Sequence, residues 1–525
     1  MKGKNVFFTG MGGTGKTFLL LQIAQRLKAK LGPNKVAVTA PTGVASIICQ
    51  GQTLHSLAGC GVPTYVSDFD KCWKQKNRWR KISVLIIDEV SMVEPSYLDW
   101  LDATVRGIRG VPDKAFGGIQ LIFCGDFGQL PGICKGATLA SACPIRIKPT
   151  TSKIPVSVDE CQSFAFQTAC WRDACFAVAE LTTVFRQSEV AMVQVLTKIR
   201  RGQLDDQVHS FIAACMRPLP EDEIKPTVLY ARNRDVDAET AANLSALPGK
   251  SEVFEAVDSV IPDEDSPPWA REQLERDCFF ASPLVPRRVT LRVGAQVMLT
   301  KNVDTGPGCP VAPADRLVNG SRGVVKRFAG REEAEAQLSA ELSRCGDEGG
   351  RAALRAQLEA VRAMAAGAFP EVQFCNGRTR ICGPEAFERT VYMTGVCRRA
   401  QVPLRLAWAL TVHKCQGDTL DRVRVDLSGC FAPGQAYVAL SRARSAAGLQ
   451  VTGFGDGAVL TDPAAVRFHD ALSAGPAALG RFLAGTPMWW DPVVRGGHDP
   501  AWRALFEAAP AFRGWVARHG PHGAA

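Results

Sequence analysis

A phosphate-binding loop near the start of the chain limits the fold more than any other feature. Residues 10–17 read Gly-Met-Gly-Gly-Thr-Gly-Lys-Thr, which is a complete G-x-x-x-x-G-K-[ST] pattern. An apolar run, residues 5–9, precedes this loop, and a helical pattern, residues 18–24, follows it. Because strand, glycine loop and helix are the setting that the motif requires, the sequence predicts a strand–loop–helix unit that binds a nucleoside triphosphate.

The chemistry of the loop assigns a role to each of its residues. Glycines let backbone N–H groups close around phosphate oxygens at the positive end of a helix. Lys16 is expected to reach the β- and γ-phosphates, and Thr17 to hold Mg²⁺. The residues expected to bind the nucleotide here are Gly10, Gly12, Gly13, Thr14, Gly15, Lys16 and Thr17.

Three further apolar runs alternate with helical patterns, at residues 35–40, 83–89 and 119–124. Apolar strands that alternate with helices favour a parallel sheet covered on both faces. Ligands of such sheets bind at the carboxyl ends of the strands, and the polar residues of these runs lie at that end.

Two of these runs end in residues suited to hydrolysis. Asp88 and Glu89 close the run 83–89 in the form of a Walker B pair. Asp88 is expected to hold Mg²⁺, and Glu89 to orient or deprotonate the attacking water. Gln129 follows the run 119–124 and could sense the γ-phosphate, although a Gly-Asp turn at this point is an ordinary feature by itself.

The length and composition predict several domains. A chain of 525 residues is too long for one core, and later runs at 228–231, 422–427 and 449–452 suggest a second α/β domain. A small β-rich domain, residues 283–402, is inserted into it and carries a helical hairpin at 331–366, which we interpret as a solvated decoration. The expected domains are 1–180, 181–282 with 403–460, the insert 283–402, and a tail 461–525.

Composition excludes some classes of protein and leaves others open. The net charge of +10 is compatible with a polyanionic partner, and the chain contains no run of 18 apolar residues that could span a membrane. Its 18 cysteines include no C-x-x-C pair, which favours reduced thiols over a metal site. The tail holds four tryptophans, for which packing against the body is the preferred interpretation over base stacking.

Arg442 lies in a Ser-Arg-Ala-Arg segment far from the phosphate loop. An arginine from a second domain could stabilise charge on the γ-phosphate, and from chemistry alone a surface arginine is an equally good interpretation. His413 has no partner pattern for a metal site.

Taken in order, these segments resemble superfamily 1 helicases of the RecD-like branch, and most closely the PIF family of 5′-to-3′ DNA helicases. The match runs from residue 5 to about residue 454. The segments that carry it are residues 10–17, 40–45, 53–56, 87–93, 97–118, 125–131, 184–187, 318–323, 413–417 and 437–444.

The resemblance implies two RecA-like domains with parallel sheets, and an ATP site between them. It implies that Arg186 and Arg442 both touch the γ-phosphate, and that Gln416 and Gly417 join the nucleotide-binding residues. A single DNA strand would lie along Pro41, Thr42, Thr53, His55 and His413. It further implies a monomer that acts on single-stranded and forked DNA, with ATP and Mg²⁺, in repair, recombination and telomere maintenance, inside the nucleus or mitochondrion.

The sequence also departs from the family pattern. Gly128 stands where the family usually has a second phenylalanine, and residues 133–162 are longer and more irregular than usual. The family's adenine-reading segment would precede the first strand, so we expect an N-terminally truncated chain. Two alternatives remain open: an ATPase that acts on RNA or RNA–DNA hybrids, and a catalytically weakened protein that only binds a strand.

Overall fold

The structure is a computed structural model that describes residues 3–63, 66–132, 164–220, 224–264, 266, 268–281, 285–303, 311, 316–346 and 348–486. The described chain divides into two compact units. The first unit comprises residues 1–183, 391–393 and 461–525, and the second comprises residues 184–390 and 394–460, as far as they are described.

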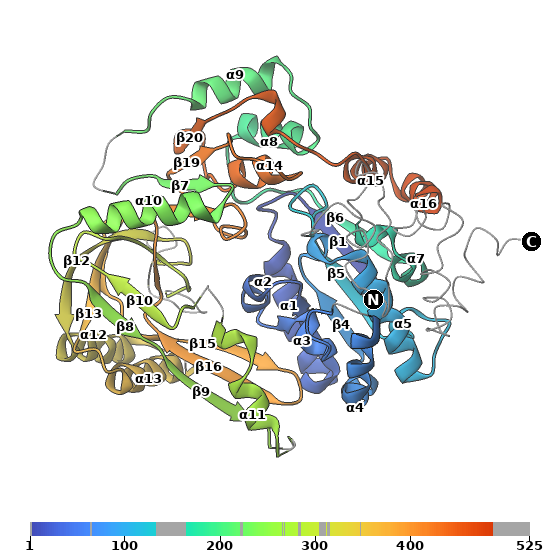
Figure 1. The fold of residues 1–525 in the computed structure, drawn as a ribbon, viewed down its shortest axis with the longest axis horizontal. Coiled ribbons are helices and arrows are strands. Elements are labelled where there is room, and N and C mark those ends of the chain that lie inside the picture. The colour runs from blue at the N-terminus through green and yellow to red at the C-terminus, as the bar shows by residue number, and fades with distance from the viewer. Residues whose placement is uncertain are drawn as a thin grey trace, which may run out of the picture. The chain divides into compact units, whose positions relative to one another are not determined.

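A parallel sheet forms the centre of the first unit (Figure 1). Within the described residues it has six strands in the order β3-β2-β4-β5-β1-β6, and every pair is parallel. The strands are β1 (Val6–Gly10), β2 (Val36–Ala40), β3 (Gln52–Thr53), β4 (Val84–Ile87), β5 (Gln120–Cys124) and β6 (Ala177–Leu181). The four strands expected from apolar runs are therefore confirmed, and β3 and β6 add to them.

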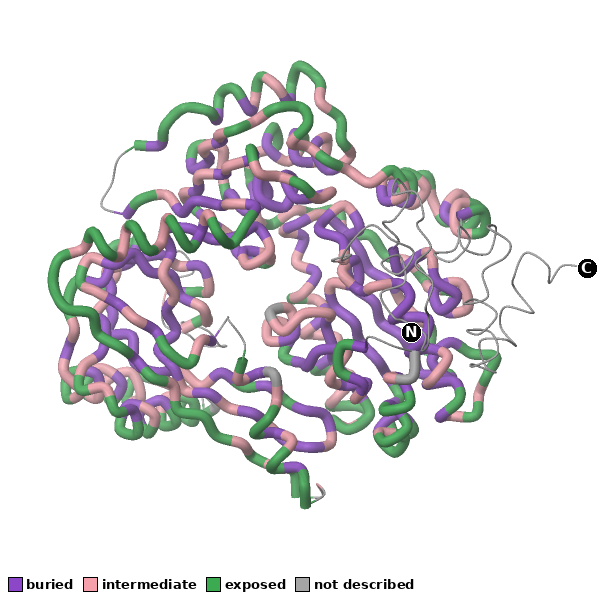
Figure 2. The backbone as a smooth tube through the Cα atoms, in the orientation of Figure 1, coloured by how far each residue is buried: buried purple, intermediate pink, exposed green. Residues whose placement is uncertain are grey.

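Helices cover this sheet on both faces. They are α1 (Lys16–Leu31), α2 (Gly43–Ile48), α3 (Leu54–Ala58), α4 (Lys76–Lys81), α5 (Pro95–Arg109), α7 (Ala169–Ala174), α15 (Pro463–Ser473) and α16 (Pro476–Gly485). Phe7 of β1 is buried in one core with residues of α5, α7 and α15, and its neighbour Phe8 is buried in another core with residues of α1. Adjacent residues of one strand enter different cores, which explains why β1, β2, β4 and β5 are buried along nearly all of their length. Figure 2 shows the burial along these strands.

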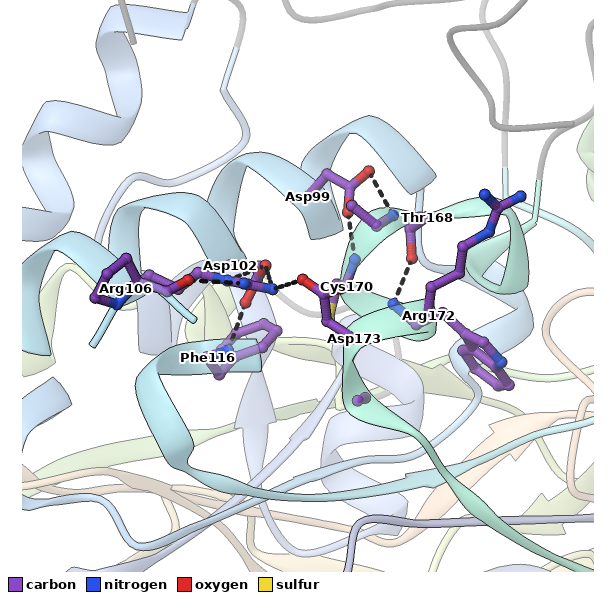
Figure 3. A network of polar contacts seen from close by, with 12 residues as sticks. Asp99, Asp102, Arg106, Phe116, Thr168, Cys170, Arg172 and Asp173 are labelled. Carbon is purple, nitrogen blue, oxygen red and sulfur yellow. Dashed lines mark hydrogen bonds and ion pairs between the residues drawn. The ribbon is translucent and has the colours of Figure 1, made fainter. Parts of the chain in front are cut away.

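A buried polar network fixes α7 against α5 (Figure 3). The carboxylate of Asp99 accepts hydrogen bonds from the backbone N–H groups of Ala169 and Cys170, at 3.2 and 2.9 Å, and so satisfies the first turn of α7. Arg106 bridges Asp102 and Asp173 at 2.6 and 2.8 Å. The network orders residues 97–118, the segment that follows the Walker B pair.

The C-terminal helices belong to the core of the first unit. Phe468 of α15 is fully buried and Leu479 of α16 is nearly so, and both lie in the same core as Phe7. The expectation of a separate tail at 461–525 is therefore wrong for residues 461–486, since the aromatic ring of Phe468 completes this core. Residues 487–525, with all four tryptophans, and residues 133–163 lie outside the described residues.

The second unit has its own parallel sheet. Within the described residues the strand order is β18-β7-β19-β20, and all pairs are parallel. The strands are β7 (Thr227–Tyr230), β18 (Ala409–Thr411), β19 (Val423–Asp426) and β20 (Leu449–Thr452). Its helices are α8 (Val190–Arg200), α9 (Asp206–Cys215), α10 (Asn233–Ala246) and α14 (Gln435–Leu440). Each expected run at 228–231, 422–427 and 449–452 forms a strand.

A β-rich region interrupts this sheet between β7 and β18. Its sheets have the strand orders β14-β13-β12-β11-β17, β15-β16-β9 and β10-β8. The strands are β8 (Glu252–Glu255), β9 (Val257–Pro262), β10 (Arg288–Leu291), β11 (Gln296–Leu299), β12 (Arg322–Gly330), β13 (Ala368–Phe374), β14 (Thr379–Ile381), β15 (Glu385–Val391), β16 (Gly395–Gln401) and β17 (Leu404–Leu406), with α11 (Ala270–Glu275) among them. Because β8 and β9 pair with β10 and β16, the region begins before the expected residue 283.

The expected helical hairpin is present as α12 (Arg331–Arg344) and α13 (Glu348–Ala363). Ala334, Leu338 and Val361 are buried in the core of the β-rich region, while ion pairs such as Arg362–Glu335, at 3.0 Å, lie on the outside. The hairpin is thus packed on one face, and only its other face fits the expected solvated decoration. None of the helices in the described residues is long and apolar enough to cross a membrane.

Candidate nucleotide site and strand-binding residues

The phosphate loop begins where β1 ends, and its glycines are required by geometry. Gly10 has φ 152°, and a Cβ atom there would lie 2.4 Å from the carbonyl oxygen of Leu181 on β6. Gly13 and Gly15 have φ values of 87° and 79°, which side chains rarely allow. Gly15 also caps the N-terminus of α1, so the loop presents its backbone at the positive end of that helix.

Lys16 closes the loop from inside. Its buried Nζ atom donates to the carbonyl oxygens of Gly10 and Met11, at 2.8 and 3.0 Å. These bonds hold the ammonium group across the loop, where a phosphate oxygen could replace a carbonyl oxygen as its partner.

The Walker B strand meets the loop at Thr17. The Thr17 hydroxyl donates to Asp88 Oδ2 at 3.2 Å, and the Glu89 backbone N–H donates to Asp88 Oδ1 at 2.9 Å. Burial raises the pKa of Asp88, and a hydrogen bond from Cys124 opposes that shift. A hydroxyl beside a buried carboxylate is an oxygen donor set that could hold Mg²⁺ and would then keep the carboxylate ionised.

Glu89 has an unusual backbone conformation. Its φ and ψ are 51° and 44°, in the left-handed region where a residue with a side chain is uncommon. Strain of this kind persists only where the surrounding structure enforces it, and it is frequent at functional sites. The turn directs the chain from β4 into the short 3₁₀ segment Val90–Met92.

Gln129 lies in a buried turn beyond β5. Its Nε2 atom donates to Asp126 Oδ2 at 3.1 Å, and the Gly128 backbone N–H donates to Asp126 Oδ1 at 3.0 Å. Phe127 is buried and packs edge-on against Phe166, with ring centroids 4.9 Å apart. The aromatic packing of this turn is therefore carried by Phe127, although Gly128 replaces the second phenylalanine of the family pattern.

The second unit brings its own set of expected residues together around Arg186. This side chain donates from Nε to the Thr419 hydroxyl at 3.0 Å, from Nη1 to the Ser441 carbonyl at 3.1 Å, and from Nη2 to the Gly417 carbonyl at 3.2 Å. Sequence reasoning missed Thr419, whose only signal was its place two residues after Gly417.

Arg442 is buried beside Arg186. Its guanidinium donates to the Val438 carbonyl at 2.9 Å and to the Ser441 hydroxyl at 2.8 Å. Desolvation lowers the pKa of Arg186 to about 9, and the positive charge of Arg442 adds to this shift. Two cations held close together form a site that an anion would stabilise. The surface interpretation of Arg442 is wrong, because its side chain is buried.

Gln416 and Gly417 adjoin this pair in sequence. Gln416 Nε2 is a buried donor for which no hydrogen-bond acceptor exists among the described residues. Gly417 is exposed and has φ 92°. A buried amide nitrogen that lacks a partner is costly unless a ligand accepts its hydrogen bond.

The residues that are expected to contact a single DNA strand differ in their environment. Pro41 and His413 are half-buried. Thr42 and Thr53 cap α2 and α3, because their hydroxyls accept from the backbone N–H groups three residues later, at 3.2 Å each.

His55 packs against Tyr97, with ring centroids 4.3 Å apart, and burial lowers its pKa to about 4. Burial also lowers the pKa of His413. Both imidazoles are therefore neutral near pH 7, so they would meet a strand by stacking or hydrogen bonding instead of by charge.

The structure thus groups the expected residues into two sets. Lys16, Thr17 and Asp88 meet within the first unit, whereas Arg186, Arg442 and Gly417 meet within the second. Sequence reasoning also missed His469, which contacts Asp126 in the described part of the first unit. Nothing in the local sequence of α15 indicated this contact, since its partner lies far away in the chain.

Known proteins share this architecture. The family described as PIF1-like helicase matches residues 1–209. The ATP-dependent DNA helicase PIF1 of Emericella nidulans is 36% identical over 496 residues, which cover 90% of this chain and 61% of that protein. The chain therefore spans about 61% of the length of that relative.

Two crystal structures extend the comparison. The Pif1 helicase from Candida albicans has 34% sequence identity and a TM-score of 0.60, over 90% of this chain and 96% of that one. The Pif1 helicase from Bacteroides in complex with ADP-AlF3 and ssDNA has 25% identity and a TM-score of 0.52, over 90% and 94% of the two chains.

Proposed function

Because the chain belongs to the PIF1-like helicase family, we propose that it is an ATP-dependent DNA helicase that moves 5′-to-3′ along a single strand. Its two parallel sheets are those of two RecA-like domains. The observation that carries the proposal is the 3.2 Å contact between Thr17 and Asp88 beside Lys16, because it joins a complete phosphate loop to the acidic strand end.

The first unit supplies the hydrolytic groups. Lys16 and the loop N–H groups bind the phosphates, and Thr17 with Asp88 holds Mg²⁺, which when bound neutralises charge on the phosphate oxygens. Glu89 accepts a proton from the attacking water or orients it. Gln129 reports the presence of the γ-phosphate through an uncharged hydrogen bond.

The second unit supplies positive charge for the transition state. Arg186 and Arg442 repel each other without an anion, so a γ-phosphate that gains negative charge is stabilised by both. Gln416, whose buried Nε2 atom has no acceptor in the described part of the chain, and Gly417 complete the nucleotide contacts. This arrangement favours hydrolysis over mere nucleotide storage.

The DNA contacts rest on family membership and on the complex of the Bacteroides relative with ADP-AlF3 and ssDNA, in which AlF3 stands in for the transferring phosphoryl group. We assign Pro41, Thr42, Thr53, His55 and His413 to the single strand, with Thr53 supporting the turn through its cap on α3. Different strand affinities in the ATP-bound and product states make the stepping directional.

The biological setting is part of the same proposal. A monomer that acts on single-stranded and forked DNA, in repair, recombination and telomere maintenance, is what the family predicts. The nucleus or mitochondrion is the expected compartment.

Nucleic-acid-stimulated ATPase assays test this proposal. Wild-type protein, Lys16→Ala and Arg442→Ala are assayed with DNA and RNA strands of matched sequence. Arg444→Ala is the control, since Arg444 is an exposed arginine two residues away that pairs with Asp421 at 3.0 Å. We expect DNA to stimulate ATP hydrolysis by the wild-type protein. The DNA-stimulated ATPase activity should fall about 100-fold or more in Lys16→Ala and Arg442→Ala, whereas that of Arg444→Ala should stay near wild type.

Other outcomes would redirect or overturn the proposal. Stronger stimulation by RNA than by DNA would favour the RNA alternative. Salt-sensitive strand binding without ATP turnover would show a strand-binding protein and contradict the enzyme. Equal losses in Arg442→Ala and Arg444→Ala would contradict the role of Arg442.

A further inference from the structure

Helix α15 lies directly on the turn that holds Gln129. Phe468 packs against Phe127 with ring centroids 5.0 Å apart, and it stacks on Phe166 at 4.7 Å with an interplanar angle of 17°. Phe468 is fully buried, so these contacts anchor α15 at one fixed position in the first unit. The residue next to this anchor therefore has a defined place beside the turn.

That residue is His469. Its Nε2 atom lies 3.3 Å from Asp126 Oδ1, and both side chains are buried, at 5% and 0% exposure. The same carboxylate also accepts hydrogen bonds from the backbone N–H of Gly128 and from Gln129 Nε2. Asp126 is thus the common partner of an imidazole from α15 and of the amide expected to meet the γ-phosphate.

A buried carboxylate adopts one orientation only when its oxygens are fully engaged. Oδ2 of Asp126 faces Gln129, and Oδ1 is held by Gly128 and His469. Without His469, the carboxylate loses its contact to α15, while its contacts within the turn remain. Rotation of the carboxylate would then release the Gln129 amide into other rotamers.

We propose that His469 is a positioning residue that fixes Asp126 and, through it, the Gln129 side chain. The consequence for catalysis rests on the proposed function, whereas the positioning itself does not. The C-terminal helices would then be part of the ATPase machinery of the first unit instead of an appended tail.

The test compares three variants. His469→Phe keeps an aromatic ring and removes the polar contact, and His469→Leu is a second variant without a donor. His469→Gln keeps a side-chain N–H donor. The matched control is His209→Ala, because His209 is an exposed histidine 3.7 Å from Asp456 in the described part of the second unit.

Two readouts are measured on the full chain. Amide hydrogen exchange of peptides that cover residues 125–132 reports the turn without any need for activity. Steady-state ATPase with saturating DNA gives kcat and the KM for ATP, and thermal melting confirms that each variant is folded. A purely structural role of His469 would lower the melting temperature without a selective change at residues 125–132.

We expect His469→Phe and His469→Leu to exchange about threefold faster or more at residues 125–132, with peptides of the phosphate loop unchanged. We expect kcat to fall about tenfold and the KM for ATP to change less than about twofold, because orientation and not ground-state binding is lost. His469→Gln should restore both, and His209→Ala should match wild type. In a Gln129→Ala background, His469→Phe should cause no further loss of kcat.

Unchanged exchange at residues 125–132 in both donor-free variants would overturn the positioning role, even if the wild-type protein is an active helicase. Additive losses of kcat from His469→Phe and Gln129→Ala would also overturn it. If wild-type protein shows no ATPase activity but exchange still increases at residues 125–132, the proposed function fails and the positioning role stands.

Discussion

At the scale of single residues, the two acidic positions at the end of β4 differ in their surroundings. Asp88 is buried and engaged by the Thr17 hydroxyl and the Glu89 backbone, so its oxygens are fixed next to the loop. Glu89 is held in a left-handed conformation that would otherwise be unfavourable. We propose that these neighbouring carboxylates divide into a metal ligand, Asp88, and a group for proton transfer, Glu89.

The lowered pKa of His55 predicts that the stability of the fold depends on pH. Burial lowers its pKa to about 4, whereas an unfolded histidine titrates near 6.5. The unfolded chain therefore binds a proton at His55 that the folded chain does not, and the fold loses stability as the pH falls from about 6.5 towards 4. His55→Phe keeps a ring against Tyr97 and removes this titration.

Between pH 7 and pH 5, we expect the free energy of unfolding of the wild-type protein to fall by roughly 1 kcal/mol more than that of His55→Phe. This figure allows for the partial exposure of the imidazole. Urea unfolding of both proteins at the two pH values measures the difference. Equal pH dependence in the two proteins would show that His55 is not held neutral by the fold.

At the scale of elements, the junction of β1, the phosphate loop and β6 sets the geometry of the site. β1 pairs with β6 in register along its whole length, and Gly10 lies opposite Leu181 at the end of both strands. Because a Cβ atom at Gly10 would collide with the Leu181 carbonyl, the loop can begin at this point only with glycine.

Gly10→Ala is therefore expected to destabilise the first unit by on the order of 1–3 kcal/mol and to weaken ATP binding. Gly480→Ala is the control, because a Cβ atom there meets nothing within 4 Å and alanine favours a helix interior such as that of α16. Urea unfolding and nucleotide titration measure both effects. Similar behaviour of the two variants would contradict the close approach at Gly10.

Elements differed in how far the sequence could predict them. β1, β2, β4 and β5 are continuous apolar runs that end in functional residues, and such strands are recognisable without any tertiary information. β8 and β9 were missed because most of their side chains are exposed and show no periodic pattern. Helices α15 and α16 were hidden by an alanine-, glycine- and proline-rich composition, and Phe127, which contacts Phe468 of α15, is distant in sequence.

The residues of the candidate site also differ in how far the sequence could predict them. The phosphate loop and the acidic pair carry motifs with a recognisable chemistry, so their positions could be predicted from order and spacing. The roles of Arg186 and Arg442 were predicted only from the resemblance to a known family. The contacts of His469 with Asp126 and of Thr419 with Arg186 depend on how distant segments pack. No local pattern encodes such contacts, and only the folded chain reveals them.

At the scale of the whole molecule, the chain combines two parallel-sheet units, of which the second contains the β-rich region. The first unit holds the phosphate loop and the acidic pair, and the second holds the paired arginines. This division of the expected catalytic groups over two units is consistent with the proposed motor, in which ATP hydrolysis is coupled to a change in affinity for the DNA strand.

Strand displacement with 5′-tailed and 3′-tailed duplexes tests this account most directly. Wild-type protein and Glu89→Gln are compared with ATP and Mg²⁺, and strand binding is measured in parallel. The account predicts that wild-type protein separates the 5′-tailed duplex and not the 3′-tailed one, while Glu89→Gln binds the strand but separates neither. Separation of the 3′-tailed duplex alone, or wild-type activity in Glu89→Gln, would contradict it.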